Sequence, residues 1–220
     1  MRASLHNCPR VNPIQSTTRA RSLSNQPDSA PTKRQSFLAA IRRFVWSGLI
    51  VATCLTAHPA TSGLLLVANK GDQTLGLIDP VAGRMIATVP EEGVTGHEVA
   101  ASPDGKFAFV PIFGNSGVGK PGTDGQLLRV INIAERKITG TLDFGKGVRP
   151  HCVVVGPKNG LLYVTTELEN SVTVIDPTAL KIVATIPTGQ AESHMLAITR
   201  DGRRGYTATV GAGTVSVLDL

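Results

Sequence analysis

A repeating unit of about 43 residues runs through residues 63–220 and constrains the fold more than any other feature of this chain. Each copy contains the same short apolar runs in the same order, separated by polar turn residues. One position of the repeat is marked by a side chain that favours turns, and these residues follow one another at spacings of 53, 44 and 43: Asp79, Asn132, Asp176 and Asp219. The longer first spacing contains a glycine-rich insertion at 116–125.

The residue pattern within each copy predicts short β-strands. The runs are rich in β-branched residues that alternate with period two, and no stretch after residue 63 keeps a helical period. Asp-Gly pairs at 104–105 and 201–202 favour tight hairpin turns, because glycine tolerates a positive φ. Four strands in about 43 residues is the size of one blade of a β-propeller. We therefore predict an all-β fold.

The third copy resembles the repeats of YVTN-family β-propeller proteins in the runs LYVT at 162–165, VTVIDP at 172–177 and IVATIPTG at 182–189. The resemblance extends over 64–220 and implies an exported protein with four-stranded blades, usually seven of them. Many such proteins have no assigned reaction, and a fold alone does not determine a function. On this resemblance the chain holds about three and a half blades of a seven-bladed parent, with approximate bounds 63–96, 97–150, 151–193 and 194–220.

The repeats would leave a ring incomplete. The first copy begins on what should be its second strand, and the last copy stops after its third. Three explanations stay open: a truncated fragment, two copies that pair to complete a ring, or a distorted four-bladed ring. Open blade edges also predict self-association, because unpaired strands invite further pairing.

The residues before the repeats look like a leader. Residues 1–36 are a basic, polar extension that we expect to be disordered, and 37–62 combine a basic flank with the apolar run 44–57, as in a signal peptide. We expect a periplasmic or secreted protein with no membrane span in its mature form; an uncleaved N-terminal anchor is the alternative. The formal charge of +6 is +7 from 1–62 and −1 from the rest, so nucleic acid is not an expected partner.

Three histidines occupy one register of the repeat, just ahead of the predicted innermost strand: His97, His151 and His194. Because equivalent blade positions converge on one axis, we expect their imidazoles to lie close together. Neutral imidazole suits copper, zinc and iron, so the three residues are candidate ligands of a transition metal. The alternative is that duplication copied a structural residue. Cys152 and Met195 follow two of the histidines, and strand alternation points them to the opposite side, into the core.

Further polar residues belong to the same predicted rim: Glu98, Arg149, Asn115 and Glu167. We predict that the rim binds a small molecule or a protein, with no assigned reaction. The alternative is a metal- or histidine-dependent enzyme, namely a lyase, a lactonase or other hydrolase, or an oxidoreductase, since a carboxylate beside an imidazole can perform acid–base chemistry.

Overall fold

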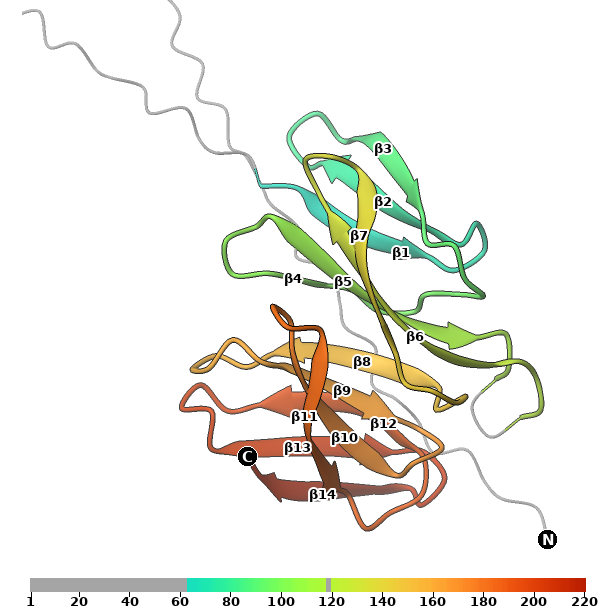
Figure 1. The fold of residues 1–220 in the computed structure, drawn as a ribbon, viewed down its shortest axis with the longest axis vertical. Helices are drawn as coiled ribbons and strands as arrows, with labels where there is room; N and C mark the ends of the chain where they lie inside the picture. The colour runs from blue at the N-terminus through green and yellow to red at the C-terminus, as the bar shows by residue number, and fades with distance from the viewer. Residues whose placement is uncertain (1–62, 118–119) are drawn as a thin grey trace, which may run out of the picture. The chain divides into compact units, whose positions relative to one another are not determined.

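The computed structural model describes residues 63–117 and 120–220, which form an all-β fold without a helix (Figure 1). The predicted extension at 1–36 and signal segment at 37–62 lie outside the described residues. Within the described ranges no helix is long and apolar enough to cross a membrane.

The strands form four antiparallel sheets that follow one another in chain order (Figure 1). The first sheet contains β1 (Leu65–Asn69), β2 (Thr74–Asp79) and β3 (Arg84–Pro90); the second contains β4 (Ala100–Ala101), β5 (Phe107–Gly114), β6 (Asp124–Asn132) and β7 (Lys137–Asp143); the third contains β8 (Pro150–Val155), β9 (Leu162–Thr166), β10 (Ser171–Asp176) and β11 (Lys181–Pro187); the fourth contains β12 (Ser193–Ile198), β13 (Arg204–Thr209) and β14 (Thr214–Asp219).

The register shows how the two three-stranded sheets relate to the four-stranded ones. In the first sheet Leu65 pairs with Ile78, as Leu162 pairs with Ile175 in the third. The strands β1–β3 therefore correspond to β9–β11, the last three strands of a complete sheet. The strands β12–β14 correspond in the same way to β8–β10.

The recurring Asp that marks the repeat has a local structural role. Asp79 Oδ1 accepts hydrogen bonds from the N–H groups of the residues two and three positions later, and Asp176 does the same. These bonds close the turn between β2 and β3 and the equivalent turn between β10 and β11 (Figure 1). The glycines of both Asp-Gly pairs have positive φ, 69° at Gly105 and 72° at Gly202, as their hairpin turns require.

Neighbouring sheets bury apolar clusters between them. Leu162 and Val164 are fully buried against the second sheet, whereas Tyr163, on the opposite face of β9, packs in a cluster with Leu196 and Leu218 of the fourth. Burying one such side chain fully contributes about 1.5–3 kcal/mol. The period-two alternation thus supplies two apolar faces per sheet, which is how the sheets stack.

The two sulfur-containing residues do not share one environment. Cys152 is buried between the third and fourth sheets, as expected. Met195, at the equivalent position of the fourth sheet, is 41% exposed, so its predicted place in the core is wrong. The reason is that no sheet among the described residues packs against that face of β12–β14.

Candidate functional site

The first strands of successive sheets bring the three histidines to one end of the fold. His151 and His194 are the second residues of β8 and β12 rather than preceding them, and His97 lies just before β4. The residue two positions before each histidine has a positive φ: 65° at Thr95, 49° at Arg149 and 58° at Glu192. Such backbone is uncommon for residues other than glycine, and its repetition turns each chain segment in the same way ahead of each histidine.

Thr165 ties the histidine-bearing strands together. Its hydroxyl accepts a hydrogen bond from the Cys152 N–H at 2.9 Å and donates one to the His194 carbonyl at 2.7 Å. The side chain is fully buried, so neither bond competes with water. Thr165 therefore fixes β12 against β8 where their histidines lie.

The imidazole of His151 contacts those of both His97 and His194, and the three rings are called the histidine cluster below. His97 Nδ1 lies 3.1 Å from His151 Nε2, within hydrogen-bonding distance. The rings of His151 and His194 have centroids 3.7 Å apart and are tilted by 34°. The sequence register therefore does bring together three side chains that are far apart in the chain.

Burial and mutual repulsion keep two of these rings neutral. Burial lowers the pKa of His97 to about 4, with further lowering by the charges of Lys70 and His194. Burial lowers the pKa of His151 to about 3, helped by the charges of His194, His97 and Lys70. Both rings are therefore uncharged at neutral pH, and one of each ring's two nitrogens carries a proton.

Neutrality determines what the His97–His151 pair offers to a ligand. Whichever of the two facing nitrogens donates, one of the outer nitrogens, His97 Nε2 or His151 Nδ1, is left as a donor and the other as an acceptor. Both outer nitrogens are buried and have no hydrogen-bond partner among the described residues. The pair thus presents one free donor and one free acceptor.

A buried ion-pair network adjoins the histidine cluster. The Arg149 guanidinium donates hydrogen bonds to Asp124 Oδ1 at 2.6 Å, to Glu167 Oε1 at 3.1 Å and to the Lys120 carbonyl at 2.9 Å. Burial by itself lowers the pKa of Arg149, but hydrogen bonds and charges from Asp124 and Glu167 outweigh it and raise the pKa. The network therefore keeps a permanent cation beneath the rim.

Glu167 connects this network to the histidines. Its side chain is fully buried, one oxygen binds Arg149, and the other, Oε2, lies 4.0 Å from His194 Nδ1. Neither Oε2 nor His194 Nδ1 has a hydrogen-bond partner within 63–117 and 120–220. With the outer nitrogens of His97 and His151, these make four buried polar atoms that are unsatisfied by the protein.

The geometry does not suit the transition metal that the histidine register suggested. A metal needs ring nitrogens that converge on one point at about 2.0–2.1 Å. Here His97 and His151 direct nitrogens at each other, and His151 and His194 meet through their ring faces. Across the part of the chain that the structure describes, no group of three or more His, Cys, Asp or Glu side chains is placed to hold a metal ion.

Two of the other predicted rim residues form no bond to the cluster within the described residues. Asn115 is exposed, and its Oδ1 accepts a hydrogen bond from the Thr123 N–H at 2.7 Å, which closes the base of the insertion. Glu98 is partly buried, and its charge adds to the effect of burial in raising the pKa of Cys152. No hydrogen bond or ion pair joins either side chain to a histidine in the described ranges.

Sequence reasoning missed two contributors. Phe113, at the end of β5, stacks on His97 with ring centroids 4.6 Å apart and meets His151 edge-on at 5.3 Å. Asp124, the next-to-last residue of the glycine-rich insertion, supplies the second carboxylate to Arg149. The only available signal for Asp124 was an acidic residue at the point where a repeat resumes after an insertion.

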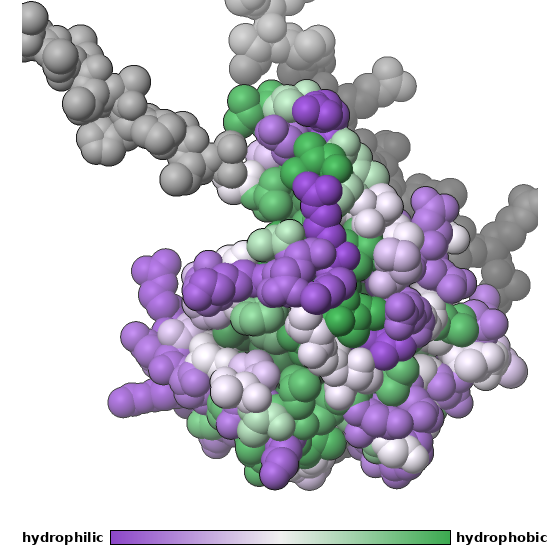
Figure 2. Space-filling model, turned by 45° about the horizontal axis from the view of Figure 1, so that its top comes forward, coloured by the Kyte–Doolittle hydropathy of each residue, from purple (hydrophilic) through white to green (hydrophobic). Residues whose placement is uncertain are grey.

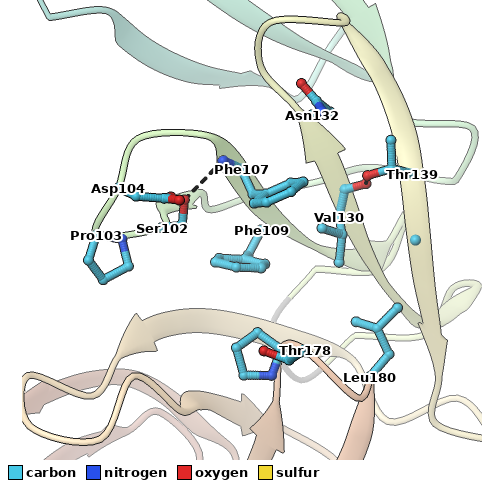
Figure 3. Close-up of a pocket in the computed structure, with 12 residues that line it drawn as sticks. Ser102, Pro103, Asp104, Phe107, Phe109, Val130, Asn132, Thr139, Thr178 and Leu180 are labelled. Carbon is cyan, nitrogen blue, oxygen red and sulfur yellow. Dashed lines mark hydrogen bonds between the residues drawn. The ribbon is translucent and has the colours of Figure 1, made fainter.

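An apolar cleft lies elsewhere in the fold. It has a volume of about 700 Å³ and opens between the second and third sheets, where Phe107, Phe109 and Val130 point toward Leu180 (Figure 3). Phe107 begins β5 and Phe113 lies near its other end, so the cleft and the histidine cluster are separated by about 20 Å of strand at about 3.3 Å per residue. We place the chemistry at the histidines, because the unsatisfied polar atoms gather there.

Comparisons with known proteins support the fold more than the function. No family model matches the chain. The chain is 30% identical to a 6-phosphogluconolactonase of Bacillus subtilis (strain 168) over 92 residues, which cover 37% of this chain and 26% of the relative. The structure of this chain is similar to that of a Kuenenia stuttgartiensis hydrazine synthase, with a TM-score of 0.60 and 21% identity. The similarity covers 71% of this chain and 43% of the hydrazine synthase chain.

The chain therefore spans about a quarter of the curated relative and less than half of the structural neighbour. The structural similarity and the stacked antiparallel sheets show a fold of the β-propeller type. The number of blades in a complete ring and membership of the YVTN family stay predictions.

Proposed function

We propose that the histidine cluster and Glu167 bind a small molecule that carries hydroxyl groups. The observation that carries this proposal is the set of four buried polar atoms without a protein partner. A buried polar group that lacks a partner costs about 1–3 kcal/mol, so a ligand that satisfies several of them gains correspondingly.

Hydroxyl groups can form hydrogen bonds with these four unsatisfied atoms. A hydroxyl both donates and accepts, as the neutral His97–His151 pair requires, and it donates readily to the carboxylate oxygen Glu167 Oε2. An additional carboxylate or phosphate on the ligand would have to avoid Glu167, so we expect the hydroxyl-bearing part to face the histidines. We also propose that the chain is an exported YVTN-type propeller, on the basis of its leader and its repeats.

Lactone hydrolysis is the second candidate. It is favoured by the similarity to a 6-phosphogluconolactonase, by the neutral imidazoles of His97 and His151, and by the carboxylate of Glu167 beside His194. In such a reaction a neutral imidazole accepts a proton from water as the water oxygen bonds to the lactone carbonyl carbon. The ring C–O bond then breaks, and the ring oxygen takes a proton to leave a hydroxy acid.

Calorimetric titration with sorbitol, gluconate and 6-phosphogluconate tests the binding proposal. We expect at least one of these compounds to bind, and Glu167→Gln to weaken that binding about tenfold or more, since a hydrogen bond to a charged group is worth about 1.5–3 kcal/mol. Glu169→Gln is the matched control, because Glu169 lies two residues away but pairs with Lys146 at the surface. Equal effects of the two variants, or no binding of any compound, would contradict the proposal.

Hydrolysis is measured separately with 6-phosphogluconolactone. A rate above the spontaneous one that His151→Phe removes would support the enzyme. Binding of the hydroxy acid without such a rate would leave the protein as a binding protein.

A further inference from the structure

The fourth sheet has an apolar face that no other described sheet covers. The exposed fractions of four side chains on β12, β13 and β14 are large for apolar residues: Met195 41%, Tyr206 38%, Val215 64% and Val217 59%. Some of these residues line a shallow groove of about 340 Å³ on the same face. Contiguous exposed apolar surface of this kind commonly marks an interaction site.

The repeat shows what normally covers this face. Strand register makes Tyr206 and Val217 equivalent to Tyr163 and Val174, since each is a cross-strand pair between the second and third strands of its sheet. Tyr163 and Val174 are 5% and 4% exposed, because the fourth sheet packs on them. The free face of the fourth sheet is thus the same surface that the third sheet buries against a following sheet.

The first sheet has a complementary face that no other sheet of residues 63–117 and 120–220 covers. Leu65 corresponds in register to Leu162, which is fully buried against the preceding sheet, yet Leu65 is 52% exposed. Met85, which pairs with Ile78 across β2 and β3, is 46% exposed, and its equivalent Ile182 in the third sheet is 44% exposed, so of these two first-sheet residues only Leu65 is far more exposed than its equivalent in a covered sheet. Figure 2 shows hydrophobic side chains at the surface in the region of β1–β3, among charged ones. In the second, third and fourth sheets, the equivalent face packs against the sheet that precedes it in the chain.

We propose that a second copy of this chain packs the free face of its first sheet, around Leu65 and Met85, onto the free face of the fourth sheet. The chain forms this kind of junction between each pair of successive sheets, and it carries both halves of one more. The contact is head-to-tail, so the two surfaces differ, and association leads to a closed ring or to a longer assembly.

Sedimentation velocity of the full chain tests the proposal with two variants that each remove one half of the junction. Val215→Lys/Val217→Lys places charge on the fourth-sheet face, and Leu65→Glu places charge on the first-sheet face. Val183→Lys is the control, because Val183 is 53% exposed on β11, the outer strand of a sheet with neighbours on both faces. Circular dichroism checks that each variant keeps its β-sheet content.

We expect the unchanged chain and Val183→Lys to associate with equal affinity, and each of the other two variants to lose at least tenfold in affinity. Mixing those two variants should restore a one-to-one dimer, because the intact face of each fits the intact face of the other. A monomeric unchanged chain, a mixture that stays monomeric, or loss of association in Val183→Lys would overturn the proposal. Association that survives Leu65→Glu would also overturn it, since the fourth-sheet face would then pair with itself.

Discussion

Replacing Arg149 by methionine should destabilise the fold strongly. Arg149 is 8% exposed and Glu167 is fully buried, and their side chains are joined at 3.1 Å. Methionine keeps much of the apolar stem but leaves the Glu167 carboxylate buried without its cation. Removing one partner of a buried ion pair costs about 3–5 kcal/mol, because the remaining charge stays out of water.

The reverse replacement should cost less. In Glu167→Leu the guanidinium keeps Asp124, at 2.6 Å, and the Lys120 carbonyl. Asp124 is 36% exposed, so this second pair is partly screened by solvent. We expect Glu167→Leu to lower the free energy of unfolding by about 1–2 kcal/mol. The double variant Arg149→Met/Glu167→Leu should be more stable than Arg149→Met alone, because no buried carboxylate is left unpaired.

Urea unfolding followed by circular dichroism measures all three variants. The expected result is a coupling free energy of at least about 2 kcal/mol between the two positions, well above the roughly 0.5 kcal/mol at which distant sites are additive. Additive effects, or a loss below about 1 kcal/mol for Arg149→Met, would show that the buried pair does not hold the rim together.

Three further outcomes follow from the site. Thr165→Val leaves the Cys152 N–H and the His194 carbonyl unpaired, so urea unfolding should show a loss of roughly 2–4 kcal/mol, whereas a loss under 1 kcal/mol would contradict the bridging role. Because the folded-state pKa values of His97 and His151 lie below the unfolded value of about 6.5, the unfolded chain binds more protons in acid, and stability falls as the pH is lowered. From pH 8 to pH 5 the loss should be about 2 kcal/mol for each of these histidines, and unfolding curves that coincide at the two pH values would refute it. Metal analysis of untagged protein should find copper, zinc and iron far below one equivalent per chain, and one equivalent of any of them would show that the imidazoles rearrange to bind it.

The repeat made the fold predictable, because its markers have local causes. Asp79 and Asp176 close turns through their own carboxylates, and alternating residues such as Tyr163 and Val164 face opposite sheets. These effects depend on near neighbours in the chain, so they can be predicted from the sequence. The exposure of Met195 could not be predicted in this way, since it depends on which sheet covers its face.

The candidate site was predictable in position but not in detail. Equal register was enough to place the histidines together at one end of the sheets. How the rings meet depends on packing across sheets, such as the stacking of Phe113 on His97. The pairing of Asp124 with Arg149 could not be predicted either, because the two residues are 25 positions apart in the chain.

His97 and His151 are neutral imidazoles in contact with each other, and a histidine side-chain NMR titration measures their protonation states directly. Long-range ¹H–¹⁵N spectra between pH 7.5 and pH 5, assigned with single His→Gln variants, report the protonation of each ring. An unperturbed histidine is about 97% protonated at pH 5. We predict that His97 and His151 stay neutral throughout, each with one protonated nitrogen, in line with pKa values of about 4 and about 3. Titration of both rings near pH 6.5 would contradict the account.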